Sequence, residues 1–374
     1  MTDLPAQARQ LFSTVTEDGR LELSLRDVPV PVPTGDEVLI RVDATPINPS
    51  DLAVLLSAAD GNSFTATPDG ATAPLPETIL RALAPRIGKP LPIGNEGAGT
   101  VVAAGDDPAA QALIGKTVAA AGGAFYAQYR LLRARECAPL PDGISAEEGA
   151  SSFVNPMTAL GMVGTMRSEG YTGLVHTAAA SNLGQMLVKL TKSEGVPLVN
   201  IVRSQAQADL LRNLGATHVV DSSSPDFMPQ LIEAIAETQA FLAFDAIGGG
   251  KLAGQILNAM EAAAVRTNPA SGPYGSSTMK QVYIYGGLNM APTEISRGFG
   301  MKWGVGGWLL TPYLMAAGPE EIGRMRAKVA AEIRTTFASS YTGRITLDQA
   351  VQPDVIAAYN RRATGEKYLI LPNG

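Results

Sequence analysis

The sequence predicts an α/β protein of two domains, one of them built on a doubly wound parallel sheet. Its 374 residues exceed what a single hydrophobic core usually supports, so two domains are expected. Residues 174–221 follow a β-α-β-α-β pattern, which predicts parallel strands joined by helices. Residues 20–45 alternate apolar and polar side chains, as strands do. An apolar share of 45% and a charged share of 17% exclude a disordered chain.

The first 150 residues are predicted to be rich in β-structure. The leucines of 21–25 occupy one face of a strand, and the aliphatic side chains of 38–42 occupy one face of the next. Shorter strands are predicted at 100–103 and 117–120, each beside glycine. Segment 58–94 is rich in Pro, Gly and Ala, and we expect a long loop there with one short helix near 77–83.

The middle of the chain is predicted to alternate strands with helices. Asn155 and Pro156 form an N-cap and a first helical position, and Gly170 ends that helix. Strands are then predicted at 174–178, 197–202, 217–221, 241–246 and 282–286, with helices over 183–195 and 205–214 between the first three. An open parallel sheet of at least five strands with helices on both faces is a Rossmann-type domain. We place this domain at 153–315.

The remaining segment, 316–374, is too small for a third domain. It is predicted to hold a helix over 320–337, a strand at 344–346, a helix over 354–363 and a terminal strand at 367–371.

The turn after strand 174–178 is the first candidate for cofactor binding. A dinucleotide site needs small residues there, so that the backbone and the free N–H groups of a helix N-terminus approach the pyrophosphate. The predicted contacts are Ala179, Ala180, Ser181, Asn182, Leu183 and Gly184. Only Gly184 of the G-x-G-x-x-G pattern is present, so a second interpretation stays open, in which Ser181 or Asn182 merely caps a core helix.

The end of the second strand predicts which cofactor is bound. An acidic residue at that place would accept hydrogen bonds from the adenosine ribose of NAD, whereas this strand ends in Arg203 and Ser204. An arginine can bind a 2′-phosphate, so NADPH is favoured, the alternative being a solvated surface arginine. Gly286, at the end of strand 282–286, completes the predicted cofactor contacts.

Four segments carry a resemblance to a known family: 46–51 (PINPSD), 94–105 (GNEGAGTVVAAG), 155–159 (NPMTA) and 200–203 (NIVR). In this order they resemble the medium-chain dehydrogenase/reductase superfamily, and in particular its zinc-free quinone oxidoreductases and 2-enoyl thioester reductases. The resemblance implies a GroES-like, β-rich catalytic domain from 1–152 completed by 316–374. It also implies an NADPH-binding Rossmann domain at 153–315 and a cleft where NADPH meets the substrate.

The same resemblance implies the reacting region. Asn48 and Thr158 are expected near the nicotinamide, with Thr158 on the first turn of the linking helix; the alternatives are a turn residue and a helix N-terminal hydroxyl. Zinc-dependent relatives carry a cysteine at the position of Asn48 and a histidine at that of Asn95. One cysteine, Cys137, and two histidines cannot complete such a site, so no metal is expected.

Two departures from the family bear on the substrate. Enoyl thioester reductases of this branch usually have a tyrosine proton donor shortly after the Asn-Pro-Ser-Asp segment, but 52–62 contains no tyrosine. Tyr126 is the remaining candidate donor, although a packing role is its simpler interpretation. Segment 58–94 is longer than the family norm and would reshape the substrate pocket. His176, inside the first strand of the sheet, is expected to be buried and hydrogen-bonded.

The expected function is metal-free transfer of hydride from NADPH to a quinone or another electron-poor C=C substrate. The alternatives are a 2-enoyl thioester reductase and a non-catalytic NADPH-binding protein of the same fold. A net charge of −6 without a basic run argues against nucleic acid, and the lack of a long apolar stretch or a signal segment predicts a cytoplasmic protein rather than a membrane protein. The apolar stretch 303–310 contains both tryptophans and predicts a homodimer through the sheet edge. The alternative is that these residues line the substrate cleft within one subunit.

Overall fold

The computed structural model describes residues 4–267, 272–361 and 364–374, which form two compact units. The first unit comprises Met1–Val154 and Lys328–Gly374, and the second comprises Asn155–Ala327. The predicted limit between the Rossmann domain and the C-terminal segment was 315/316, whereas the structure divides at Ala327 and Lys328. This division falls inside helix α10 (Leu310–Ala331). This helix is interrupted by Gly318, whose φ of 80° is not helical.

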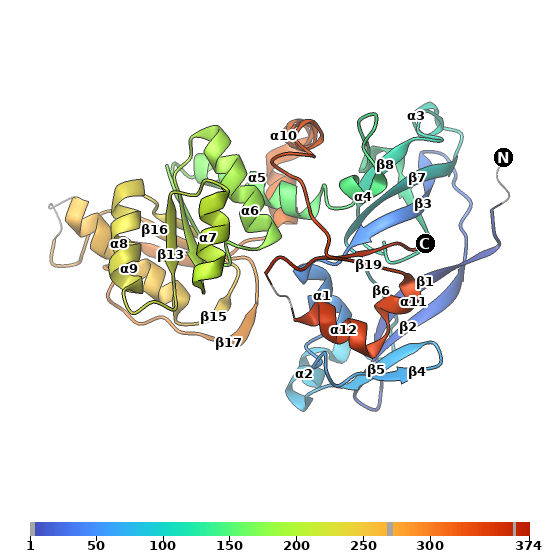
Figure 1. The fold of residues 1–374 in the computed structure, drawn as a ribbon, viewed down its shortest axis with the longest axis horizontal. Coiled ribbons are helices and arrows are strands. Elements are labelled where there is room, and N and C mark those ends of the chain that lie inside the picture. Colours follow the sequence, from blue (N-terminus) through green and yellow to red (C-terminus); the bar gives the residue numbers. More distant parts are fainter. Residues whose placement is uncertain (1–3, 268–271, 362–363) are drawn as a thin grey trace. The chain divides into compact units, whose positions relative to one another are not determined.

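Two sheets make up most of the first unit (Figure 1). One has the strand order β4-β5-β2-β1-β6, and the other has the order β10-β8-β7-β3-β20-β19, with β9 paired to β3. The central strands are β1 (Gln7–Val15), β2 (Arg20–Pro29), β3 (Glu37–Pro46), β7 (Glu96–Ala104), β8 (Thr117–Ala121), β9 (Tyr129–Arg133) and β10 (Cys137–Pro139). Their predicted faces are confirmed, since Leu21, Leu23, Val38 and Val42 are fully buried.

The end of the chain returns to this unit. β20 (Tyr368–Ile370) pairs antiparallel with β3, joining Leu369 to Pro46 and Ile370 to Thr45, and β19 (Gly343–Ile345) pairs parallel with β20. The short helices α11 (Leu347–Ala350) and α12 (Pro353–Asn360) lie between these strands in the sequence. The C-terminal strand therefore lies beside the segment that leads to Asn48.

Segment 58–94 is not the long loop that the sequence predicted. β4 (Thr65–Thr67) and β5 (Gly70–Pro74) form a hairpin that extends the first sheet through β2, and β6 (Leu91–Pro92) pairs with β1. The predicted short helix is present as α2 (Glu77–Ala82). The strands escaped prediction because the small residues of TAT and GATAP show no alternation of large apolar side chains.

The second unit is the predicted doubly wound sheet. Six parallel strands of its described residues have the order β13-β12-β11-β14-β16-β18. The strands are β11 (Leu174–His176), β12 (Leu198–Val202), β13 (His218–Asp221), β14 (Leu242–Asp245), β16 (Lys280–Ile284) and β18 (Trp303–Gly307). The main helices are α5 (Val154–Ser168), α6 (Asn182–Glu194), α7 (Gln205–Asn213), α8 (Phe227–Thr238) and α9 (Leu252–Thr267). The sequence placed 303–310 after the last strand, whereas its first five residues are the edge strand β18.

The two faces of this sheet bury different side chains. Val175, Ala243 and Val282 pack in one core with residues of α8 and α9. His176, Phe244 and Tyr283 are paired across neighbouring strands on the opposite face. Helices therefore cover both faces, as predicted.

The strand order reverses between β11 and β14, whose carboxyl ends are joined by a buried hydrogen bond. Thr177 Oγ1 donates to Asp245 Oδ1 at 2.7 Å, and Ala246 N donates to Thr177 Oγ1 at 2.8 Å. Ligands of open α/β sheets bind outside the carboxyl ends of the strands at such a reversal. The candidate cofactor residues follow these two strands and their neighbours.

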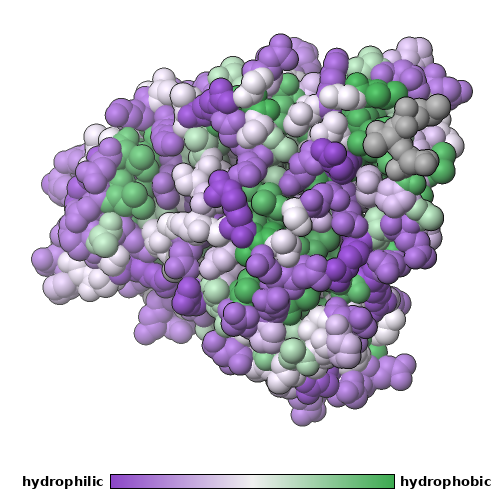
Figure 2. Space-filling model, turned by 45° about the vertical axis from the view of Figure 1, so that its right-hand side comes forward, coloured by the Kyte–Doolittle hydropathy of each residue, from purple (hydrophilic) through white to green (hydrophobic). Residues whose placement is uncertain are grey.

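Figure 2 shows one face, on which hydrophilic side chains predominate and hydrophobic ones are confined to separate patches. Within the described part of the chain, no helix has the length and apolar character needed to cross a membrane.

Candidate active site

Small residues allow the tight turn between β11 and α6. Ala178 has a positive φ of 50°, and Ser181 caps α6 by accepting a hydrogen bond from Gly184 N at 3.1 Å. A Cβ at position 184 would lie 2.0 Å from Ala179 O, so only glycine fits there. Gly184 is therefore the glycine of the pattern that lets the helix pack closely against the strand end.

The other predicted residues of the turn surround this contact. Ala179 and Ala180 are buried, Leu183 is buried in the first turn of α6, and Ser181 and Asn182 are partly exposed. Because the turn lies at the N-terminus of α6, the helix dipole favours a negative charge there. Ser181 does cap the helix, as the second interpretation held, and this capping is compatible with anion binding beside it.

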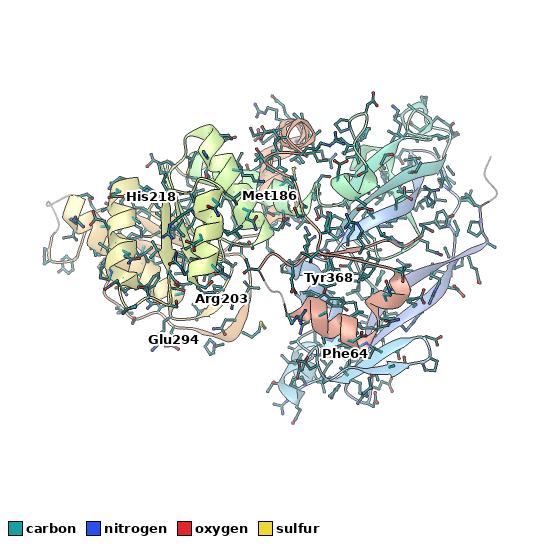
Figure 3. The ribbon with its side chains drawn as sticks, in the orientation of Figure 1. Phe64, Met186, Arg203, His218, Glu294 and Tyr368 are labelled. Carbon is teal, nitrogen blue, oxygen red and sulfur yellow. The ribbon has the colours of Figure 1, made fainter. Side chains whose placement is uncertain are left out.

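Arg203 follows β12 and is exposed (Figure 3). Its backbone N–H donates to Gln207 Oε1 at 2.9 Å, and Ser204 caps α7 by accepting from Gln207 N at 3.4 Å. Among the described residues, the Arg203 guanidinium has neither a hydrogen bond nor an ion pair. It is thus available to an anionic group at the carboxyl edge of the sheet.

Gly286 lies two residues after β16, close to the end of β14. A Cβ at this position would lie 2.7 Å from Ala246 O, so a side chain would push the two strand ends apart. The neighbouring Tyr285 hydroxyl lies 2.7 Å from His176 Nε2. His176 is fully buried, and burial lowers its pKa to about 3, which confirms the predicted buried and hydrogen-bonded histidine.

A cavity of about 760 Å³ opens on the same unit beside Tyr285 and Gly286. Aromatic rings of Tyr285, Trp308 and Tyr313 contribute to its wall, and Trp308 Nε1 donates to Thr165 Oγ1 at 3.0 Å. Thr158 lies on the same helix, α5, as Thr165 and is buried. Because α5 begins at Val154 rather than after Asn155, Thr158 lies in the second turn and not the first.

Asn48 lies in the first unit, at the N-cap of α1 (Pro49–Leu55). Its backbone N–H donates to Asp51 Oδ2 at 2.8 Å, and its side-chain Nδ2 donates to Glu96 Oε1 at 2.8 Å. The residue is 1% exposed. The structure thus gives Asn48 a role in the turn, and contact with an acceptor oxygen stays a prediction.

Three buried ionisable residues around Asn48 were missed by the sequence analysis: Asp51, Glu96 and Lys367. Burial raises the pKa of Glu96, and the nearby Lys367 opposes this shift. Burial lowers the pKa of Lys367 to about 8, and its ammonium donates to Ser151 Oγ at 2.8 Å. Asp51 stands in the segment PINPSD and Glu96 in the segment GNEGAG. An acidic residue among small or apolar neighbours was the signal that could have indicated a buried carboxylate.

Asp51 joins the turn of Asn48 to the segment that carries Asn95. Its Oδ1 accepts from Asn95 N at 2.8 Å, while Asn95 Nδ2 donates to Ser50 Oγ at 3.1 Å. Burial raises the pKa of Asp51 to about 7, against hydrogen bonds from Asn48 and Asn95 that lower it. Asn95 therefore serves this network; in the described ranges, no group of three or more His, Cys, Asp and Glu is placed to hold a metal ion.

Tyr126 is fully buried in the core of the first unit. Its hydroxyl donates to Pro46 O at 3.2 Å, and burial raises its pKa well above the usual value. These features are those of a packing residue, and a role as proton donor stays a prediction.

Comparison with known proteins supports the resemblance that the sequence showed. Residues 34–142 match the alcohol dehydrogenase GroES-like domain. The structure is similar to that of a candidate NADPH:quinone reductase from Mesorhizobium loti, with a TM-score of 0.74 and 28% identity over 99% of this chain and 100% of that one. The chain is therefore similar to proteins of the medium-chain dehydrogenase/reductase superfamily over nearly its whole length. The predicted GroES-like and Rossmann architecture of this superfamily is thereby confirmed.

Two curated members of the superfamily match parts of the chain. The quinone oxidoreductase of Pseudomonas aeruginosa is 29% identical over 176 residues, which are 46% of this chain and 54% of that protein. The mitochondrial enoyl-acyl-carrier-protein reductase of Bos taurus is 27% identical over 222 residues, 58% of this chain and 53% of that protein. The chain therefore matches about half the length of these two relatives.

A first prediction concerns the exposed arginine. A charge-assisted hydrogen bond is worth roughly 1.5–3 kcal/mol, so Arg203→Ala should weaken NADPH binding about 10- to 100-fold and leave NADH binding nearly unchanged. Fluorescence titration with both cofactors measures this. Arg212→Ala, which removes an exposed arginine paired with Asp209 on α7, is the matched control and should change neither affinity. Equal losses of NADPH and NADH affinity in Arg203→Ala would refute the assignment.

A second prediction follows from the raised pKa of Asp51. The folded protein keeps a proton on this carboxyl up to about pH 7, whereas the unfolded chain releases it near its ordinary pKa of 3.8. Stability therefore falls as the pH rises from about 4 to 7, by at most about 1.4 kcal/mol per pH unit. Asp51→Asn should flatten this part of the curve of unfolding temperature against pH. Asp348→Asn, which removes an exposed ion-pair partner of Arg9, is the control and should leave the curve unchanged. Parallel curves for wild type and Asp51→Asn would contradict the prediction.

Proposed function

We propose that the protein is an NADPH-dependent, zinc-independent oxidoreductase that reduces a quinone or another electron-poor C=C acceptor. The observation that carries this proposal is the carboxyl edge of the second sheet. There, Gly184 and Gly286 allow close backbone approach, and Arg203 offers an unpaired guanidinium. The relatives named quinone oxidoreductase and NADPH:quinone reductase support it.

The residues at this edge fit NADPH. The turn 179–184 would hold the pyrophosphate at the N-terminus of α6, and Arg203 with Ser204 would hold the 2′-phosphate. Gly286 would admit the cofactor beside the end of β14, and Thr158 would bind the nicotinamide half. Bound NADPH supplies the hydride, so the protein has chiefly to orient the acceptor and exclude water.

Protonation favours a quinone over an enoyl thioester. An alkene receives a hydride on one carbon and a proton on the next, whereas a reduced quinone oxygen collects protons from solvent. Segment 52–62 has no tyrosine, and the Tyr126 hydroxyl is buried in the core, where it interacts with Pro46 O and with Asp51. The enoyl thioester reductase activity remains the alternative, supported by the similarity to the Bos taurus enzyme.

We further propose a cytoplasmic homodimer that acts on a small molecule and binds neither nucleic acid nor a membrane. The net charge of −6 supports the exclusion of nucleic acid. β18 is the last strand in the sheet order, so its outer backbone groups are unpaired within the sheet. Trp303 is 36% exposed, which favours burial of this edge against a second copy. Leu309 is 65% exposed but also lines the cavity beside Tyr285, which favours the alternative role of this stretch in the substrate cleft.

The acceptor preference is a third prediction. NADPH oxidation should be faster with quinones than with enoyl thioesters, and Asn48→Ala should lower kcat/KM about 10-fold or more, the scale of one lost hydrogen bond. Tyr126→Phe keeps the packing and removes the hydroxyl, so quinone reduction should be unchanged. A selective loss of enone reduction in this variant would make Tyr126 the proton donor. Efficient enoyl thioester reduction that neither substitution affects would refute the proposed site. If NADPH is not oxidised with any of the acceptors, the remaining interpretation is a non-catalytic NADPH-binding protein.

The oligomeric state is a fourth prediction. Light scattering at micromolar concentration should give twice the 38.9 kDa of one chain. A single-chain mass under these conditions would reject the dimer.

A further inference from the structure

Glu96, the first residue of β7, has one carboxylate that holds two separate segments. Oε1 accepts from Asn48 Nδ2 at 2.8 Å. Oε2 accepts from the backbone N–H groups of Phe153 at 2.9 Å and Val154 at 2.8 Å, where α5 begins. Glu96 is 1% exposed. A single buried side chain therefore connects the N-cap of α1 with the start of α5.

The partners require an ionised carboxylate. Each of these three contacts comes from an N–H donor, which favours the charged form of an acid. Burying that charge is costly, and Lys367 offsets the cost through its attraction to Glu96. Lys367 is itself fixed, since its ammonium and the Tyr341 hydroxyl both donate to Ser151 Oγ at 2.8 Å.

We propose that Glu96 is a positioning residue for hydride transfer, which orients the Asn48 amide and fixes the first amides of α5. This inference rests on the proposed function, because Asn48 and Thr158 of α5 are the groups assigned there to the acceptor and the nicotinamide. Glu96 acts through these residues and does not touch the reacting atoms.

A role in stability alone explains the arrangement less well. Replacing buried ion pairs by well-packed apolar side chains of similar volume is often neutral or stabilising. An ionised acid at this position thus contributes little that apolar packing would not. What the carboxylate adds is geometry: two acceptor atoms that fix three donors from two segments.

Glu96→Gln is the most direct substitution. The glutamine is isosteric, but its amide nitrogen must face either Asn48 Nδ2 or the N–H groups of Phe153 and Val154, so one set of contacts becomes donor against donor. We expect kcat to fall about 10-fold or more, while KM for NADPH stays within about twofold, because the phosphate turn and Arg203 are untouched. Loss of NADPH affinity with unchanged kcat would overturn the inference.

Two variants separate positioning from charge and from general stability. Glu96→Asp keeps the charge but is one methylene shorter and does not reach both segments, so it should be as impaired as Glu96→Gln; full kcat in Glu96→Asp would reduce the role to charge balance with Lys367. Glu148→Gln is the matched control. Glu148 also accepts from a backbone N–H, that of Ser145 at 2.8 Å, and pairs with Arg334, but its side chain is 37% exposed; kcat should not change.

A double-mutant cycle tests the path through Asn48. Glu96→Gln should lower kcat much less in the Asn48→Ala background than in wild type, because the amide that it orients is gone. Losses that simply multiply would show that Glu96 acts independently of Asn48 and would overturn the inference.

Hydrogen exchange keeps this test separate from the proposed function. In Glu96→Gln, the amides of Phe153 and Val154 should exchange faster than in wild type, while Glu148→Gln should leave them unchanged. If none of the acceptors tested supports NADPH oxidation by the wild-type protein, the proposed function fails. The exchange rates alone then decide whether Glu96 fixes the start of α5. Unchanged exchange at both amides in Glu96→Gln would overturn the inference whether or not the protein is active.

Discussion

The close contact between Gly184 and the carbonyl of Ala179 is the constraint on which the cofactor edge depends. With a Cβ only 2.0 Å from that oxygen, any other residue would push α6 away from β11. The contact sets the direction of the α6 N-terminus, and Ser181 completes it by capping Gly184 N. Gly286 meets the end of β14 under a similar constraint. Small residues are needed here because backbone atoms of neighbouring elements lie too close for a side chain. The ability to bind an anion follows from the resulting position of the helix N-terminus.

In the first unit, the candidate site depends on buried acidic and basic side chains whose charges offset each other. Asp51, Glu96 and Lys367 lie in one network with backbone N–H groups, and each is almost fully removed from solvent. Burial raises the pKa of both acids and lowers that of the lysine, while the attraction between the lysine and the acids opposes these shifts. Such a network fixes geometry at some cost in stability. The network fixes Asn48 and Asn95, the two positions where the resemblance implies a cysteine and a histidine in zinc-dependent relatives.

The sequence predicted the second sheet well because the local patterns agree with the tertiary structure. Helix α6 begins after Ser181 and ends at Gly195, whose φ of 65° only glycine adopts readily, and these limits follow from local rules. The hairpin of β4 and β5 was missed because its small residues carry no period. The network was missed for another reason: Lys367 and Glu96 are far apart in the sequence, and only the pairing of β20 with β3 brings the chain end beside the Asn48 turn. Pairing between distant strands leaves no local signal.

The proposed function requires that the carboxyl edge of the second sheet binds NADPH by its phosphates. Calorimetric titration of the wild-type protein with NADPH and with NADH, under identical salt, measures this binding. We expect one NADPH per chain and an NADH affinity lower by about 10-fold or more, the scale of a charge-assisted contact with the 2′-phosphate. Equal affinity for the two cofactors, or no binding of either, would contradict it.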